Sequence, residues 1–405
     1  MSTGENIPET PEQAAATGTL AARIALRQRS GGVIVPALTV VVAFLMGGVV
    51  VLATGHNPLI AYRDIFNGAG LNWIFHPTTD VASTSAYNLS QTLLQTTTLI
   101  LTGLAVAFAF RCGMFNIGGQ GQYFVGIIVA NWIGVDFAGM NPVPHILLVI
   151  AAGTVAGGAW AAIAGFLKAT VGAHEVISTI MLNWIAIYTA SWLLGDGGPL
   201  QNSADRTVPV SNDIADSAKL PVFWGQQQLQ GLHIGFFVAI AALVVFYLLL
   251  NRTTLGYEVR AVGFNPDAAA YGGINVKKNL VRAMAISGAF AGLAGALDMT
   301  GYLYHYGQTD IPISNVGFLG IAVALLGRNT AVGTALGAIL FGGLLYGTTH
   351  GLTSTVIQPE LAGNLTYIIQ GLIVLFVGAD VLILYIWNTR RKLRRLPAQP
   401  AKVTA

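Results

Sequence analysis

The chain has 405 residues, of which 54% are hydrophobic and only 9% are charged. Soluble domains carry roughly 25% charged residues, so this composition excludes an ordinary soluble protein and indicates a membrane protein with several spans. The formal net charge is +3, and one cysteine, Cys112, is present. A single cysteine excludes a disulfide within the chain and a metal site built from cysteines.

Apolar segments long enough to cross a bilayer, which needs about 20 residues, recur along the chain. In order they are 33–54, 89–110, 116–134, 146–167, 176–195, 232–250, 283–301, 316–327, 331–349 and 364–387. The segment 316–327 is short, so we expect it to be tilted and extended by its flanks or to be half of a broken helix. The sequence therefore predicts an all-α polytopic membrane protein with about 10 transmembrane helices.

The basic residues predict the orientation of these spans. If both termini are cytoplasmic, only Arg63, Arg206 and Lys219 of the 20 basic residues lie outside. Cytoplasmic loops carry an excess of lysine and arginine, so the N- and C-termini are predicted to be cytoplasmic.

This orientation divides the chain into three parts. Residues 1–30 are polar and are expected to be a disordered cytoplasmic N-terminus, residues 31–389 are expected to form the transmembrane domain, and residues 390–405 a basic cytoplasmic tail. Within the transmembrane part, the segment 252–282 becomes a cytoplasmic loop that holds seven charged residues. A membrane protein with one large charged loop on one side usually presents that loop to a partner.

Two pairs of short segments resemble each other. Residues 124–130 (FVGIIVA) resemble 318–324 (FLGIAVA), and residues 153–157 (GTVAG) resemble 333–337 (GTALG). In the predicted topology each pair runs in opposite directions, which is the pattern of an inverted repeat with a solute path at the repeat interface. Chance similarity between segments rich in glycine, alanine and valine is the alternative.

Polar residues follow the second predicted span. Asn116, Gln120 and Gln122 alternate with glycines between positions 111 and 122. Non-helical backbone at membrane depth is tolerated only beside protein or a water-filled cavity, so this stretch is either a broken element that lines a solute path or a cytoplasmic turn before a helix.

Other polar residues within the spans are candidates for the same path. Glu175 could bind a solute hydroxyl or stabilise a helix start, where the helix dipole favours negative charge. Asn183 lies two turns further on the same face, and hydrogen bonding between helices is its alternative role. Asp298 and Tyr302 could grip a hydroxylated or heterocyclic solute, although an interfacial aromatic belt explains the tyrosine equally well.

Enzyme motifs are missing from the sequence. It contains no G-x-x-x-x-G-K-[ST], no H-E-x-x-H and no G-x-S-x-G. The chain is therefore not expected to be an enzyme or to bind a cofactor, and an ATP-driven role would need a separate ATPase chain.

A short helix is predicted inside the 252–282 loop. Asn265 can cap it and Pro266 suits its first position, while Gly272 or Gly273 can end it. One or two turns of helix would fit a cleft in a cytoplasmic partner, whereas a capped surface turn without a partner is the alternative. The residues expected to make this contact are Arg260, Gly263, Asn265, Pro266, Ala268, Ala269, Ala270, Gly273 and Ile274.

Four stretches of the sequence resemble a known family. Residues 260–274 (RAVGFNPDAAAYGGI) look like the coupling-helix region of ABC importer permeases of the branched-chain amino acid/simple-sugar (ribose-type) family. Residues 113–126 (GMFNIGGQGQYFVG) resemble the first-repeat signature of that family, and residues 320–338 (GIAVALLGRNTAVGTALGA) the second. Residues 174–183 (HEVISTIMLN) are similar to the nucleoside-type subgroup. The resemblance covers roughly residues 90–350.

The sequence departs from the family pattern at one turn. Arg328 and Asn329 follow Gly327, where many relatives are expected to have a second glycine. The conformation of this turn is therefore left open.

The resemblance implies the permease subunit of an ATP-driven importer for nucleosides or related simple sugars in the bacterial plasma (inner) membrane. It implies a second permease subunit in a homo- or heterodimer, cytoplasmic ABC ATPases that hold ATP and Mg, and an extracytoplasmic solute-binding lipoprotein. The alternative is an ion-coupled secondary transporter, which should use an ionisable residue at midplane, whereas Asp298 is off-centre. An integral membrane enzyme is disfavoured by the missing motifs.

Overall fold

The computed structural model describes residues 20–75, 77, 82–204, 206–311, 315–352, 364, 367–373 and 375. The predicted tail 390–405 and most of the predicted span 364–387 lie outside the described residues, as do residues 1–19. The part of the predicted N-terminal segment from Leu20 onward belongs to helix α2.

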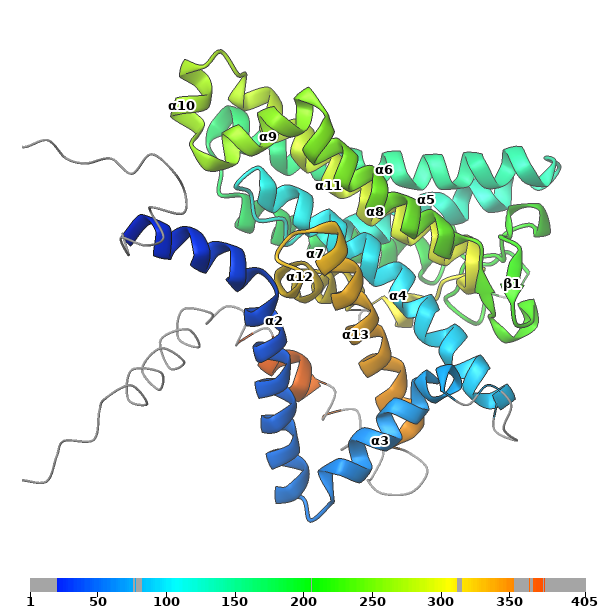
Figure 1. Ribbon diagram of the computed structural model, residues 1–405. Coiled ribbons are helices and arrows are strands. Elements are labelled where there is room, and N and C mark those ends of the chain that lie inside the picture. The colour runs from blue at the N-terminus through cyan, green and yellow to red at the C-terminus, as the bar shows by residue number, and fades with distance from the viewer. Residues whose placement is uncertain are drawn as a thin grey trace, which may run out of the picture.

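The described chain is mainly helical (Figure 1). Its first half contains α2 (Leu20–Ala53), α3 (Pro58–Gly68), η1 (Leu71–Ile74), α4 (Ala82–Arg111), α5 (Gly119–Asp136), α6 (Pro142–Val171) and α7 (Glu175–Leu194). The second half contains α8 (Gly235–Arg252), α9 (Thr254–Phe264), α10 (Pro266–Tyr271), α11 (Val276–Asp298), the π-helix η4 (Met299–Leu303), η5 (Gln308–Asp310), α12 (Val316–Leu326) and α13 (Ala331–Gly351).

The segment between α7 and α8 lies at one end of the bundle. It forms the short helices η2 (Asp216–Ala218) and η3 (Gln227–Leu229) and a small antiparallel hairpin of β1 (Val222–Trp224) and β2 (Leu232–His233). Figure 1 shows this hairpin at the end of the helices opposite to α9 and α10. The segment between α7 and α8 and the 252–282 loop therefore lie at opposite ends of the bundle.

Seven helices in the described part of the chain are long and apolar enough to cross a membrane. They are Pro36–Ala53, Ser83–Arg111, Pro142–Val171, Glu175–Leu194, Gly235–Arg252, Val276–Leu303 and Ala331–Gly351. Two further predicted spans correspond to α5, whose first turn is polar, and to α12, which has 11 residues. The chain is thus a multi-pass membrane protein, and the total of about 10 spans stays a prediction.

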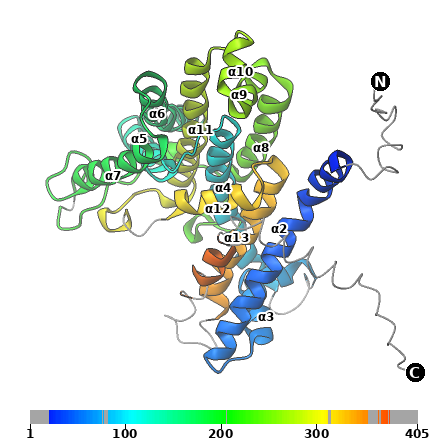
Figure 2. The ribbon, with the colours of Figure 1, turned by 90° about the vertical axis from the view of Figure 1, so that its left-hand side faces the viewer.

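Helix α4 lies at the centre of the bundle and α7 at its edge, as Figure 2 shows. Helix α4 packs on α12 and α13, and α11 packs on α5 and α6. Glycines line the contact of α11 with α5 and α6: a Cβ atom added to Gly292 would lie 2.4 Å from the Gly153 carbonyl oxygen, and one on Gly126 would lie 2.5 Å from the Gly292 oxygen. Small residues are required there because the backbones touch.

Candidate functional site

The 252–282 loop folds as two helices that meet at Asn265. The Asn265 side-chain oxygen accepts hydrogen bonds from the backbone N–H groups of Asp267 and Ala268, both at 3.0 Å. Pro266 is the first residue of α10, and the helix ends at Gly272, followed by Gly273 at φ +83°. The predicted start and end of this short helix are confirmed, because both signals are local.

The side chains around α10 divide into exposed and buried ones. Phe264 and Tyr271, at the two ends of the helix, are 90% and 97% exposed. Pro266, Ala268 and Ala270 are exposed as well. Neither aromatic residue is among the contact residues predicted from the sequence, although large apolar side chains beside a charged loop were a usable signal.

Ala269 and Ile274 belong to the inner side of this loop. Ala269 is only 5% exposed and lies in the core of the chain itself, and Ile274 is half-buried against that core. The Ile274 backbone N–H donates to the Ala269 carbonyl, which closes the end of α10. These two predicted contact residues therefore hold α10 to this chain, and the exposed ones face outward.

The end of α9 lies against the segment that follows α4. A Cβ atom on Gly263 would lie 2.3 Å from the Arg111 carbonyl oxygen, so only glycine fits this contact. Arg260, one turn earlier, donates from Nε to the Gly256 carbonyl at 3.2 Å. Gly263 thus joins the 252–282 loop to the residues between α4 and α5.

Residues 111–120, which we call the α4–α5 segment, contain a buried polar cluster. Asn116 donates to Ser287 Oγ of α11 at 2.7 Å and exchanges hydrogen bonds with the Gln122 side chain at 2.9 and 3.0 Å. Its oxygen also accepts from the Gly118 N–H at 2.9 Å. Helix α5 begins at Gly119, three residues after the predicted start of this span at position 116, because these bonds hold the preceding backbone outside the helix.

Two further amides connect this segment to neighbouring helices. Gln120 accepts from the Gly317 N–H of α12 at 2.7 Å. Asn183 of α7 accepts from the Gly121 N–H at 2.8 Å and donates to the Ile117 carbonyl at 2.9 Å. The predicted candidates Asn116, Gln120, Gln122 and Asn183 therefore lie together, buried and bonded within the chain.

Glu175 stands apart from that cluster at the start of α7. Its carboxylate pairs with Lys168 of α6 at 2.8 Å, and its side chain is 13% exposed. The pair bridges the ends of two consecutive helices.

Asp298 forms a second buried polar cluster towards the other end of the bundle. Its carboxylate accepts from Thr98 Oγ1 of α4 and from the Tyr123 hydroxyl of α5, both at 2.7 Å, and it also interacts with Tyr302. The π-helix η4 begins one residue later, and such local widening of a helix is frequent at functional sites. The predicted pair Asp298 and Tyr302 is therefore brought together, while Thr98 and Tyr123 carry no signal in the sequence.

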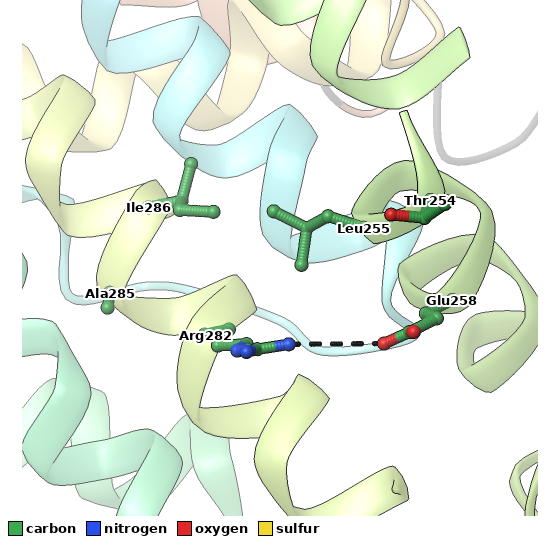
Figure 3. Close-up of a pocket in the computed structure, with 6 residues that line it drawn as sticks. All are labelled: Thr254, Leu255, Glu258, Arg282, Ala285 and Ile286. Carbon is green, nitrogen blue, oxygen red and sulfur yellow. Dashed lines mark ion pairs between the residues drawn. The ribbon is translucent and has the colours of Figure 1, made fainter. Parts of the chain in front are cut away.

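A pocket of about 420 Å³ lies between α9 and α11. Its lining, drawn in Figure 3, consists of Thr254, Leu255, Glu258, Arg282, Ala285 and Ile286. Arg282 and Glu258 face each other across it at 4.0 Å, a loose ion pair between two partly exposed side chains.

The comparisons with known proteins give the family. Residues 88–378 match the family model described as branched-chain amino acid transport system / permease component. The chain belongs to this family. Its relatives are named permease proteins of ABC transporters, which are transport subunits and not enzymes.

The similar proteins cover most of the chain. The guanosine ABC transporter permease protein NupP of Bacillus subtilis is 36% identical over 90% of this chain and 98% of its own length. The nucleoside ABC transporter permease protein NupB of Lactococcus lactis is 34% identical over 88% and 94%. A glucose ABC transporter permease of Haloferax volcanii is 32% identical over 84% and 86%. No solved structure matches the chain.

Proposed function

We propose that this chain is the permease subunit of an ATP-driven importer that carries nucleosides across the plasma membrane. The observation that carries the proposal is the 36% identity to the guanosine permease NupP over nearly all of that protein's length. Nucleosides are favoured over simple sugars because the nucleoside and guanosine permeases share more of this sequence than the glucose permease does.

The second permease subunit is proposed to be a different chain. The relatives include two permeases from the same organism in two cases, NupP with NupQ in Bacillus subtilis and NupB with NupC in Lactococcus lactis. This chain is 36% and 34% identical to NupP and NupB but only 28% and 26% identical to NupQ and NupC. It would therefore occupy the NupP position of a heterodimer.

The proposed topology has about 10 spans with both termini in the cytoplasm and an inverted repeat. The packing supports the repeat, because α4 lies on α12 and α13 while α11 lies on α5 and α6. Each three-helix unit (α4–α6 and α11–α13) thus packs its first helix on the last two helices of the other unit. An inverted repeat places the solute path where such units meet.

The 252–282 loop, which we call the coupling loop, is proposed to dock in a cytoplasmic ABC ATPase, which holds ATP and Mg. Phe264 and Tyr271 are exposed at the two ends of α10, and buried aromatic anchors supply much of the binding energy of protein interfaces. Arg260, Gly263 and Asn265, which caps α10, would support the helix from the membrane side. A solute-binding lipoprotein would deliver the solute at the opposite end of the bundle.

The solute path is proposed to run beside the α4–α5 segment and Asp298. The side-chain amides of Asn116 and Gln122 are bonded to each other, and those of Gln120 and Asn183 are bonded to the backbone of neighbouring helices. Separation of these helices would therefore free the amides for a solute. A hydrogen bond exchanged for another costs little net free energy. Glu175, Asp298 and Tyr302 would add polar groups at the two ends of this path.

Uptake measurements test the proposal. Cells without nucleoside uptake are given this chain with its partner permease, ATPase and lipoprotein, and radiolabelled guanosine is supplied. We expect uptake that stops on ATP depletion, persists with an uncoupler, and is competed by other nucleosides but not by glucose. Uptake that survives ATP depletion and collapses with the uncoupler would overturn the ATP-driven mechanism, and competition by glucose alone would overturn the substrate.

A further inference from the structure

Arg111, the last residue of α4, connects two turns at the same end of the bundle. Its guanidinium Nε and Nη2 both donate to the Asn329 carbonyl oxygen, at 3.0 and 2.7 Å. Asn329 lies in the turn between α12 and α13, in which Arg328 and Asn329 have φ values of +51° and +53°. Two consecutive non-glycine residues in the left-handed region are strained, and charge-assisted bonds to the turn offset part of that strain.

The backbone of Arg111 makes the second connection. A Cβ atom added to Gly263 would lie only 2.3 Å from the Arg111 carbonyl oxygen, which is too close for a side chain. A Cβ atom added to Gly113 would lie 3.3 Å from Gly263 Cα. The last turn of α9 therefore rests directly on the α4–α5 segment, with no side chain between them. Any displacement of α9 and α10 towards the bundle must push on Arg111.

The α4–α5 segment holds α12 at both ends. At one end of the segment, Arg111 binds the turn after α12 through Asn329. At the other end, Gln120 binds the first turn of α12 through the Gly317 N–H at 2.7 Å. Because α12 has only 11 residues and both its ends are bound to one segment, the two must move together.

The start of α9, unlike its end, borders open space. The first half of α9 borders the pocket of about 420 Å³ in Figure 3, across which Glu258 and Arg282 are separated by 4.0 Å. Helix α9 thus has space beside its start and a close backbone contact at its end. That combination allows α9 to tilt about Gly263 rather than to slide.

We propose that Arg111 is a positioning residue for transport, which passes movement of the coupling loop to α12 through Gly263 on one side and Asn329 on the other. The inference rests on the proposed function, because it assumes that an ATPase moves α10. Arg111 touches neither the solute nor ATP. It acts by keeping the α4–α5 segment and α12 in one rigid unit.

The test measures solute uptake and ATP hydrolysis in parallel, with the complete transporter in lipid vesicles. We expect Arg111→Gln to keep ATP hydrolysis within about twofold of wild type. The solute transported per ATP should fall about tenfold or more in Arg111→Gln and in Gly263→Ala, since the loss of charge-assisted bonds changes an equilibrium by roughly that factor. Gly272→Ala is the matched control, because its Cβ atom would meet its own helix at an ordinary 3.5 Å. Asn329→Gly should keep the wild-type ratio, since it relieves the strain and retains the carbonyl.

The outcomes separate this inference from the proposed function. If Arg111→Gln transports as much solute per ATP as wild type, Arg111 does not link the loop to α12, while wild-type uptake still shows an ATP-driven permease. If Arg111→Gln does not assemble, Gly263→Ala decides the matter, and an unchanged ratio in it overturns the proposal. Uptake by wild type without ATP would instead contradict the proposed function itself.

Discussion

The coupling loop and the α4–α5 segment both interrupt apolar helices with polar residues and glycines, but the hydrogen-bond partners of their polar side chains differ. In the loop, Asn265 caps a local helix, and the side chains of Phe264 and Tyr271 point away from the bundle. In the segment, Asn116 and Gln120 are buried and bonded to helices far away in the sequence. The loop is organised by its own residues and leaves two aromatic side chains exposed, whereas the segment is organised by the rest of the chain.

This difference has a direct consequence for mutations. Changes on the outside of the coupling loop should alter association with another protein and leave the fold intact. Changes in the α4–α5 segment or its partners should alter the stability of the permease itself. Thermal stability and assembly, measured on the same variants, separate the two effects.

The largest effect on assembly is expected for Phe264→Ser and Tyr271→Ser. Each exposed aromatic should act as an interface anchor worth about 2 kcal/mol, so each change should weaken ATPase binding about 30-fold and leave the melting temperature unchanged. The measurement is ATPase association in detergent, with Tyr257→Ser as the control because Tyr257 is also exposed (64%) but lies on α9. Full association in both variants would contradict the docking surface.

The largest effect on the fold, rather than on assembly, is expected for Asn183→Leu. The change removes the bonds to Gly121 and Ile117 and leaves one buried and one half-buried backbone group unsatisfied, at a cost of about 3 kcal/mol. Thermal unfolding in detergent checks this prediction. Ile185→Leu, on the exposed face of the same helix, should melt like wild type, and equal melting of Asn183→Leu would show that the bonds are unimportant.

His233 lies in β2, at the end of the bundle opposite to the coupling loop. Its ring is fully buried and accepts from the Gly235 N–H at 3.1 Å, and burial lowers its pKa from 6.5 to about 4. Below pH 6.5 the unfolded chain takes up a proton that the folded chain does not, so stability should fall between pH 6.5 and about 4. The loss should reach about 3 kcal/mol at most, and less where neighbouring groups relax.

The pH dependence is checked by melting wild type and His233→Gln between pH 4 and 7. The difference in stability between the two proteins should shrink as the pH falls, because only the wild type loses the contribution of a buried neutral imidazole. A difference that is constant over this range would contradict the assignment.

The smallest effect is expected for Asn265→Ala. Loss of the cap should loosen α10 by about 1 kcal/mol, without unfolding the permease, and lower uptake a few-fold. Asn265→Asp retains an oxygen that can accept from the same N–H groups and should transport like wild type. If alanine and aspartate behave alike, the cap does not organise the coupling loop.

The sequence predicted the features that depend on neighbouring residues and missed those that depend on distant ones. The start of α10 at Pro266 and its end at Gly272 followed from capping rules. The start of α5 was displaced to Gly119, because Asn116 bonds to Ser287, which is 171 residues further along the chain. Nothing in the sequence marks so distant a partner.

The candidate site shows the same division. Asn116, Gln120, Gln122 and Asn183 were chosen for their polarity within apolar surroundings, and the structure places them together. Thr98 and Tyr123, which complete the Asp298 cluster, look like ordinary helix residues in the sequence. The contact of Gly263 with Arg111 could not be predicted either, because a glycine in a sequence does not indicate which backbone segment it will contact.

Site-specific cross-linking from α10 tests the central claim most directly. Cys112 is buried, so a cysteine introduced by Tyr271→Cys is the reactive thiol among the described residues, and Leu229→Cys, exposed at the opposite end of the bundle, is its control. We predict that a short bifunctional reagent joins the Tyr271→Cys permease, and not the Leu229→Cys permease, to the ATPase of the active transporter. A transporter that imports guanosine with ATP but gives no cross-link from α10, or gives one from Leu229→Cys instead, would contradict the account.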